Sequence, residues 1–107
     1  MKTTYVQRGE SLDYANSTSA QIQAGDVVTL GGRIGIAGCD IPAGEVGSVH
    51  VTGVFLIPKK TVTDVISQGD TLYYDEGATK TSGAVTMGYA AAASDKTDAL
   101  VAVKLLG

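Results

Sequence analysis

Apolar and polar residues alternate in short runs along most of the chain, which is the pattern of half-buried β-strands. Turn residues, mostly Gly, Asn, Asp and Ser, separate these runs at intervals of roughly 8–12 residues, a spacing typical of small β-barrels and sandwiches. We therefore expect an all-β fold, a small barrel or a jelly-roll-like sandwich. The strands are expected at residues 11–16, 27–30, 33–37, 49–58, 72–75, 86–93 and 99–106, with a short return strand at 80–81.

Two places interrupt the alternation. Residues 61–68 carry apolar side chains at 62, 65 and 66, so we expect at most one short helical turn there, crossing from the first half of the chain to the second. Gly53 lies inside the longest apolar run. Glycine in a strand often marks a bulge, which would switch the faces of the residues beyond it.

The chain contains a duplicated pattern. Gly25-Asp26, followed by an alternating run, returns as Gly69-Asp70, and each copy is followed by a Gly-containing strand, 34–37 in the first and 87–90 in the second. We interpret this as a pseudo-duplicated strand–hairpin unit, with a longer insertion in the second copy. Gly31-Gly32 between two alternating runs predicts a tight hairpin.

Length and charge narrow the classes of protein. We expect the 107 residues to form a single domain, 1–107, around one modest core. The formal net charge is −3 and basic residues do not cluster, which argues against a nucleic-acid partner. The sequence contains no run of about 18 apolar residues, the length that a membrane-spanning helix needs, so no membrane partner is expected. Lys59-Lys60 follows Pro58 and is typical of a charged strand end.

The sequence offers no catalytic constellation, and we expect no enzyme, no cofactor and no metal site. Cys39 is the only cysteine, so it cannot form an intrachain disulfide. The single histidine, His50, is expected at the surface rather than in a metal site, which would need several convergent ligands. The carboxylates lie mostly beside Gly or in turns, where turn chemistry explains them.

The order of the motifs resembles a family of small tailed-phage and prophage head proteins, the capsid decoration or cement proteins. The resemblance covers nearly the whole chain. It is carried by residues 5–12 (YVQRGESL), 24–28 (AGDVV), 35–37 (GIA), 47–49 (GSV), 53–59 (GVFLIPK), 68–75 (QGDTLYYD) and 102–107 (AVKLLG).

This resemblance implies a structural virion protein without catalytic activity. Such a protein binds the outer surface of an assembled capsid and cements contacts between major capsid protein subunits. Its partners would be the major capsid protein and itself, as a homo-oligomer for which we favour a trimer over a dimer. It would be made in the bacterial host cytoplasm and reside on the capsid surface. A tail or head-fibre module of the virion and a small ligand-binding domain are the alternatives.

Two segments are expected to contact the capsid. The N-terminal run is short and β-prone, so it can close the domain's own sheet or pair with a capsid strand, and it carries residue types that dominate interface energetics. The loop from Gly38 to Gly47 is the second candidate. The expected contact residues are Tyr5, Val6, Gln7, Arg8, Cys39, Asp40, Ile41 and Pro42.

Overall fold

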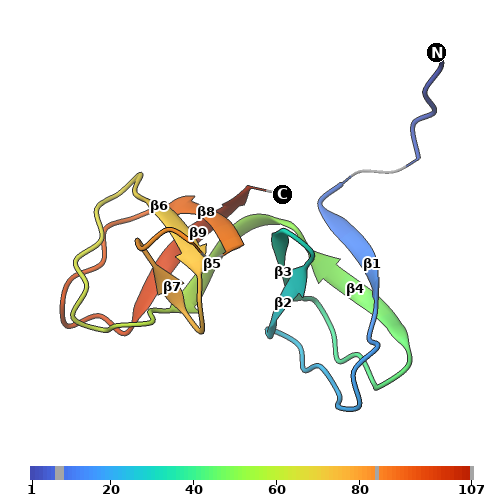
Figure 1. Cartoon of the computed structure of the whole chain (residues 1–107), viewed down its shortest axis with the longest axis horizontal. Coiled ribbons are helices and arrows are strands. Elements are labelled where there is room, and N and C mark those ends of the chain that lie inside the picture. Colours follow the sequence, from blue (N-terminus) through green and yellow to red (C-terminus); the bar gives the residue numbers. More distant parts are fainter. Residues whose placement is uncertain (7–8, 84, 107) are drawn as a thin grey trace.

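The computed structural model describes residues 1–6, 9–83 and 85–106, and within them it contains strands and no helix. The strands form two antiparallel sheets that lie side by side (Figure 1). The all-β prediction is therefore confirmed. The first sheet contains β1 (Ser11–Ala15), β2 (Val27–Leu30), β3 (Arg33–Ala37) and β4 (Val46–His50). The second contains β5 (Thr52–Pro58), β6 (Thr71–Tyr74), β7 (Ala78–Thr79), β8 (Val85–Ala90) and β9 (Leu100–Leu106).

The two sheets repeat one topology. Their strand orders are β1-β4-β3-β2 and β5-β9-β8-β6-β7, so β1, β2, β3 and β4 correspond to β5, β6, β8 and β9. β7 is the insertion that the longer second copy predicted. The duplicated strand–hairpin unit is thus confirmed, as is the hairpin at Gly31-Gly32, which joins β2 to β3 in antiparallel register.

The same turn opens the second strand of each unit. In the first, the Asp26 N–H donates to the Gln23 carbonyl, and the Asp26 carboxylate accepts a hydrogen bond from the Gln23 N–H. Asp70 and Ser67 make the same two bonds in the second unit. A short aspartate side chain can satisfy turn amides in this way, which explains why Asp recurs after Gly at this position.

A buried polar side chain follows the first strand of each unit. Asn16 follows β1 and its amide donates to the carbonyls of Ala20 and Ile41, at 2.8 and 2.9 Å. Lys59 follows β5, and its ammonium donates to the carbonyls of Asp64 and Asp95, at 2.6 and 2.8 Å. Lys59 lies directly after the end of β5, as the interpretation of Lys59-Lys60 as a charged strand end predicts, but it is only 5% exposed. Its charge is held by fixed carbonyl dipoles rather than by water.

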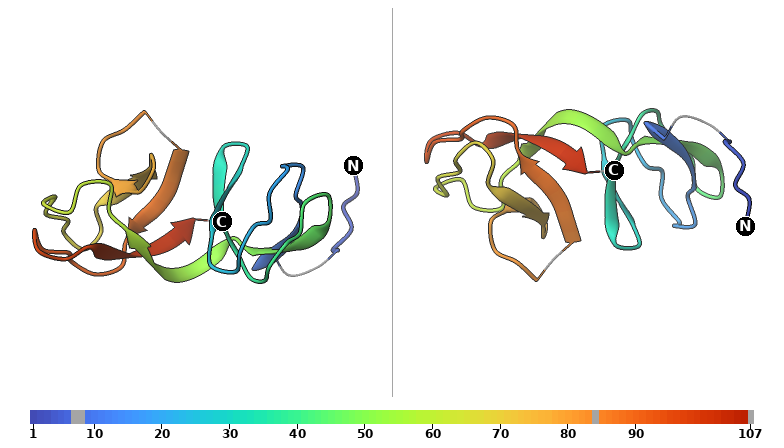
Figure 2. Two further views of the ribbon diagram at one scale, coloured as in Figure 1. Left: turned by 90° about the horizontal axis from the view of Figure 1, so that it is seen from below. Right: turned by 90° about the horizontal axis from the view of Figure 1, so that it is seen from above.

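The larger hydrophobic cluster draws on both sheets. Ile34 and Ile36 of β3 are buried in it together with residues of the second sheet. The second sheet curls around this cluster (Figure 2), and a parallel bridge from Lys59 to Ala78 brings the end of β5 against β7. The smaller cluster belongs to the first half of the chain. It contains Val28, Ala37, Ile41, Val49 and Val51.

Gly53 does not form the expected bulge, since β5 pairs with β9 in continuous register from Thr52 to Pro58. It has φ +117°, in the region that favours glycine, and it lies between the end of β4 and the body of β5. Val49 and Val51 are buried in the smaller cluster, whereas Ile57 is buried in the larger one and Phe55 packs against it. The faces beyond the glycine are therefore not switched, because the positions that face the cores are odd-numbered on both sides of it, although the chain passes from one core to the other here.

Residues 61–68 contain a single tight turn instead of a helix. The Asp64 N–H donates to the Thr61 carbonyl at 3.1 Å, and Ile66 then forms a bridge with Ser94. β-branched residues occur along this stretch and disfavour a helix. Of the three apolar residues that suggested a helical turn, only Ile66 is buried in the core, since Val62 and Val65 are exposed.

Candidate functional site

The N-terminal segment, residues 1–6, forms an arm that leads away from both sheets (Figures 1 and 2). Tyr5 and Val6 are 79% and 85% exposed. These six residues take no part in the strands of either sheet. Gln7 and Arg8, the other two expected contact residues here, lie outside the described residues. The arm thus presents an aromatic and a branched aliphatic side chain without cover from its own domain.

The second expected segment divides between surface and core. Cys39, Asp40 and Pro42 are exposed. Ile41 is fully buried in the smaller cluster, and it exchanges backbone hydrogen bonds with Ile22. The Asp40 carboxylate accepts a hydrogen bond from the Ala24 N–H at 2.8 Å. This loop is therefore held to the Gly25 turn, and three of its four candidate residues remain at the surface.

A third surface, which the sequence reasoning missed, lies on the outer face of β5 and β9. Val54 and Leu56 are 58% and 69% exposed, and their partners across the pair are Lys104 and Ala102. Leu100 and Leu106 are also exposed on β9. We call these four exposed residues, Val54, Leu56, Leu100 and Leu106, the outer apolar face.

A signal for this surface was present in the sequence. Val54, Phe55, Leu56 and Ile57 are consecutive apolar residues, so both faces of the strand are apolar. Such continuous apolar runs are typical of strands covered on both faces. The structure covers the face of Ile57 and leaves the face of Leu56 open. The outer face is therefore apolar, yet the described residues of the chain do not cover it.

Few charges border the outer apolar face. The Lys104 ammonium lies over the ring of Tyr89, 5.7 Å from its centroid, which is within the range of a cation–π contact. Lys60, just beyond β5, is paired with Asp75. The hydrogen bond to Asp75 and its negative charge raise the pKa of Lys60, which stays protonated at neutral pH. The face is thus mostly apolar, with the Lys104 cation on it opposite Val54.

The other chemistry-bearing groups have structural roles. His50 Nδ1 lies 3.0 Å from the Ser11 Oγ, and its ring lies 6.0 Å from the ring of Phe55. Among residues 1–6, 9–83 and 85–106, no three His, Cys, Asp or Glu side chains are grouped so that they could hold a metal ion. In the same part of the chain no helix is long and apolar enough to cross a membrane.

Comparison with known proteins gives one match. The family model described as "Phage cement protein" matches residues 6–105, which is nearly the whole chain. Neither the curated proteins nor the solved structures contain a significant match. The matched range includes both sheets except Leu106 at the end of β9, the loop at residues 38–47 and three of the four residues of the outer apolar face, and it begins at the end of the arm.

Proposed function

Because the chain belongs to the phage cement protein family, we propose that it binds the outer surface of an assembled capsid and stabilises contacts between major capsid protein subunits. Its role is structural and involves no catalysis. Decoration of this kind repeats one contact many times over a symmetric shell. Each contact can then be modest, because several are engaged at once.

The outer apolar face is the observation that carries this proposal. Large apolar side chains exposed together on a sheet are typical of protein–protein contacts. Leu56 and Val54 lie near its middle, and a partner that covered them would bury surface worth about 25 cal/mol per Å² of apolar area. We propose that this face lies against the shell.

The arm and the loop extend the same contact. Tyr5 and Val6 are the most exposed large side chains after Met1, and an extended arm can reach a neighbouring subunit while the body is docked. We propose that the arm, with Tyr5, Val6, Gln7 and Arg8, binds a capsid strand, and that Cys39, Asp40 and Pro42 meet the shell. The Ile41 side chain supports this loop from within the core.

We also propose that copies of the protein associate with one another on the shell, as a trimer rather than a dimer. An oligomer would engage several capsid subunits at once, which lowers the affinity required of each single contact. Native mass spectrometry of the free protein, and of protein released from heads, measures the number of copies directly.

The test uses heads that lack the protein. Such heads are incubated with the full-length chain, with a chain lacking residues 1–6, or with buffer, and are then heated while release of packaged DNA is followed. We expect the full-length chain to raise the temperature of release and the shortened chain to do so only at higher concentration. Equal survival of decorated and undecorated heads would exclude the cementing role. Full activity of the shortened chain would exclude the arm as a contact.

A further inference from the structure

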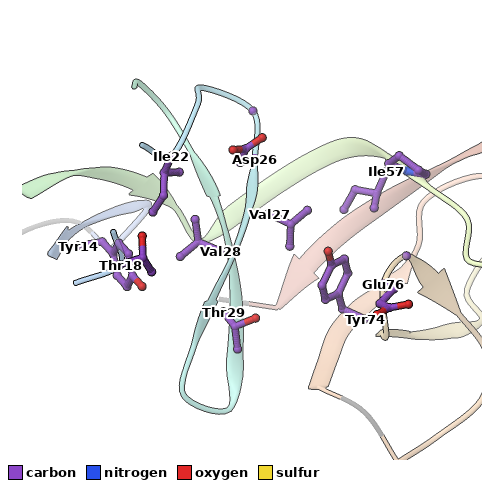
Figure 3. Close-up of a pocket in the computed structure, with 13 residues that line it drawn as sticks. Tyr14, Thr18, Ile22, Asp26, Val27, Val28, Thr29, Ile57, Tyr74 and Glu76 are labelled. Atoms are coloured by element: carbon purple, nitrogen blue, oxygen red, sulfur yellow. The ribbon is translucent and has the colours of Figure 1, made fainter. Parts of the chain in front are cut away.

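A cleft of about 650 Å³ separates β2 of the first sheet from β5 and the β6–β7 turn of the second. Its apolar wall contains Val27, Ile57 and Tyr74. The ring of Tyr74 points from β6 toward β2, with its hydroxyl near Val27 (Figure 3). Both β2 and β5 are terminal strands in their sheets, so the cleft is bordered by unpaired strand edges.

One edge of β2 has backbone N–H and C=O groups that no described strand of its sheet pairs with. The carbonyl of Asp26 accepts a hydrogen bond from Ala37, on β3. Because amide groups alternate in direction along a strand, the N–H and C=O groups of Val27 and Thr29 point away from β3, toward the cleft. Among the described strands none pairs with β2 on that side. An open edge of this kind is a template for strand addition.

The acidic lining of the cleft favours an added strand that carries a basic side chain. Asp26 and Glu76 are exposed carboxylates in its lining, Asp26 beside β2 and Glu76 in the β6–β7 turn (Figure 3). The described lining contains no Lys or Arg. An extended segment lying along β2 would therefore gain from a basic side chain placed near either carboxylate.

We propose that this cleft binds an extended segment of the capsid shell that carries a Lys or Arg, and that the segment adds to the open edge of β2 as a further strand. The inference rests on the proposed function, since it names the part of the shell that enters the protein. The N-terminal segment of a second copy is the rival occupant, because Lys2 and Arg8 make it basic.

The experiment measures binding of the full-length protein and its variants to undecorated heads by co-sedimentation, at low and moderate salt. Thr29→Pro removes one N–H on the open edge and leaves the bonds to β3, since proline is tolerated at strand edges. Thr29→Ala is the matched control, because it keeps the N–H. The double variant Asp26→Asn, Glu76→Gln removes both charges, and the amide oxygen introduced by Asp26→Asn can still accept the hydrogen bond from the Gln23 N–H.

We expect Thr29→Pro to weaken binding about tenfold and Thr29→Ala about twofold at most, as one lost hydrogen bond implies. The double charge variant should also bind more weakly and depend less on salt. Wild-type affinity of both Thr29→Pro and the charge variant overturns the inference. Wild-type protein that does not bind heads overturns the proposed function, and the inference falls with it. If the variants instead dissolve an oligomer of the free protein, a second copy fills the cleft and the inference is wrong.

Discussion

At the centre of the same face, the repeated unit is polar in the first half of the protein and apolar in the second. In the β1–β4 pair, Asp13 lies opposite Ser48. At the corresponding place in the β5–β9 pair, Leu56 lies opposite Ala102. The first unit shows that this strand arrangement forms with polar residues on that face. The apolar residues of the second unit are therefore not required by the fold, and we attribute them to a partner.

The two units also differ in how closely their strands approach. Gly35 and Gly88 occupy the same place in β3 and β8, opposite Val28 and Leu72. A Cβ on Gly88 would overlap the carbonyl oxygen of Lys104, whereas a Cβ on Gly35 would lie 3.3 Å from the nearest atoms. The second unit is thus packed more tightly at its centre, and this difference can be tested.

The largest effect is expected from Gly88→Ala. The new methyl group would force β8 and β9 apart, because its neighbour is backbone and cannot rotate away. We expect a loss of about 4 kcal/mol in the free energy of unfolding, against about 1 kcal/mol for Gly35→Ala. Denaturant unfolding of both variants measures the difference. Equal losses would show that the two units are packed alike.

A smaller effect is expected from the buried polar side chains. Lys59→Met keeps the aliphatic stem but leaves the carbonyls of Asp64 and Asp95 without their donor. We expect a loss of about 3 kcal/mol. Asn16→Ala, at the corresponding place, should cost about 2 kcal/mol because its partners are also carbonyls but no charge is involved. Thermal unfolding ranks the two variants. A Lys59→Met protein as stable as the wild type would show that the hydrogen bonds of the buried ammonium do not stabilise the fold.

The repeated turn should respond equally in both units. Gly25 and Gly69 have φ of +89° and +92°, and a Cβ on either would meet nothing within 4 Å. The cost of Gly25→Val or Gly69→Val then comes from the backbone conformation alone, about 2 kcal/mol in each case. Melting temperatures of the two variants test the equivalence, which fails if one variant is stable and the other is not.

The smallest effect on stability is expected on the outer apolar face. Leu56→Ser should change the free energy of unfolding by less than about 0.5 kcal/mol, because the side chain is already exposed. The same change should weaken binding to undecorated heads severalfold. Asp13→Ser, at the corresponding place in the first unit, is the control for both measurements. If Leu56→Ser binds as the wild type does, the face does not meet the shell.

Sequence reasoning predicted the strands because alternation and turn chemistry are local. Gly31-Gly32 and Gly25-Asp26 each mark a turn that the structure confirms, whereas the bulge expected at Gly53 is absent. Burial beyond the strands is not local, and here the predictions were less complete. The position of Lys59 at a strand end was predicted, but its burial was not, because carbonyls distant in the sequence accept hydrogen bonds from its ammonium.

For the candidate surfaces too, features that depend on local sequence were easier to predict than burial that depends on distant residues. The sequence left open whether the N-terminal run closes the domain's own sheet or pairs with a capsid strand, and the exposure of Tyr5 argues against the first alternative. Ile41 could not be separated from its exposed neighbours, because its burial depends on pairing with Ile22, a long way back along the chain. The cleft is likewise formed by strands from different sheets, so no continuous motif could mark it.

The placement of Ile34 and Ile36 in the cluster of the second sheet governs how the molecule loses its structure. If the second unit unfolded first, Ile34 and Ile36 of β3 would become exposed to water. The first unit would then lose much of the packing that stabilises it. Unfolding of the halves is therefore coupled, and calorimetry should record one cooperative transition.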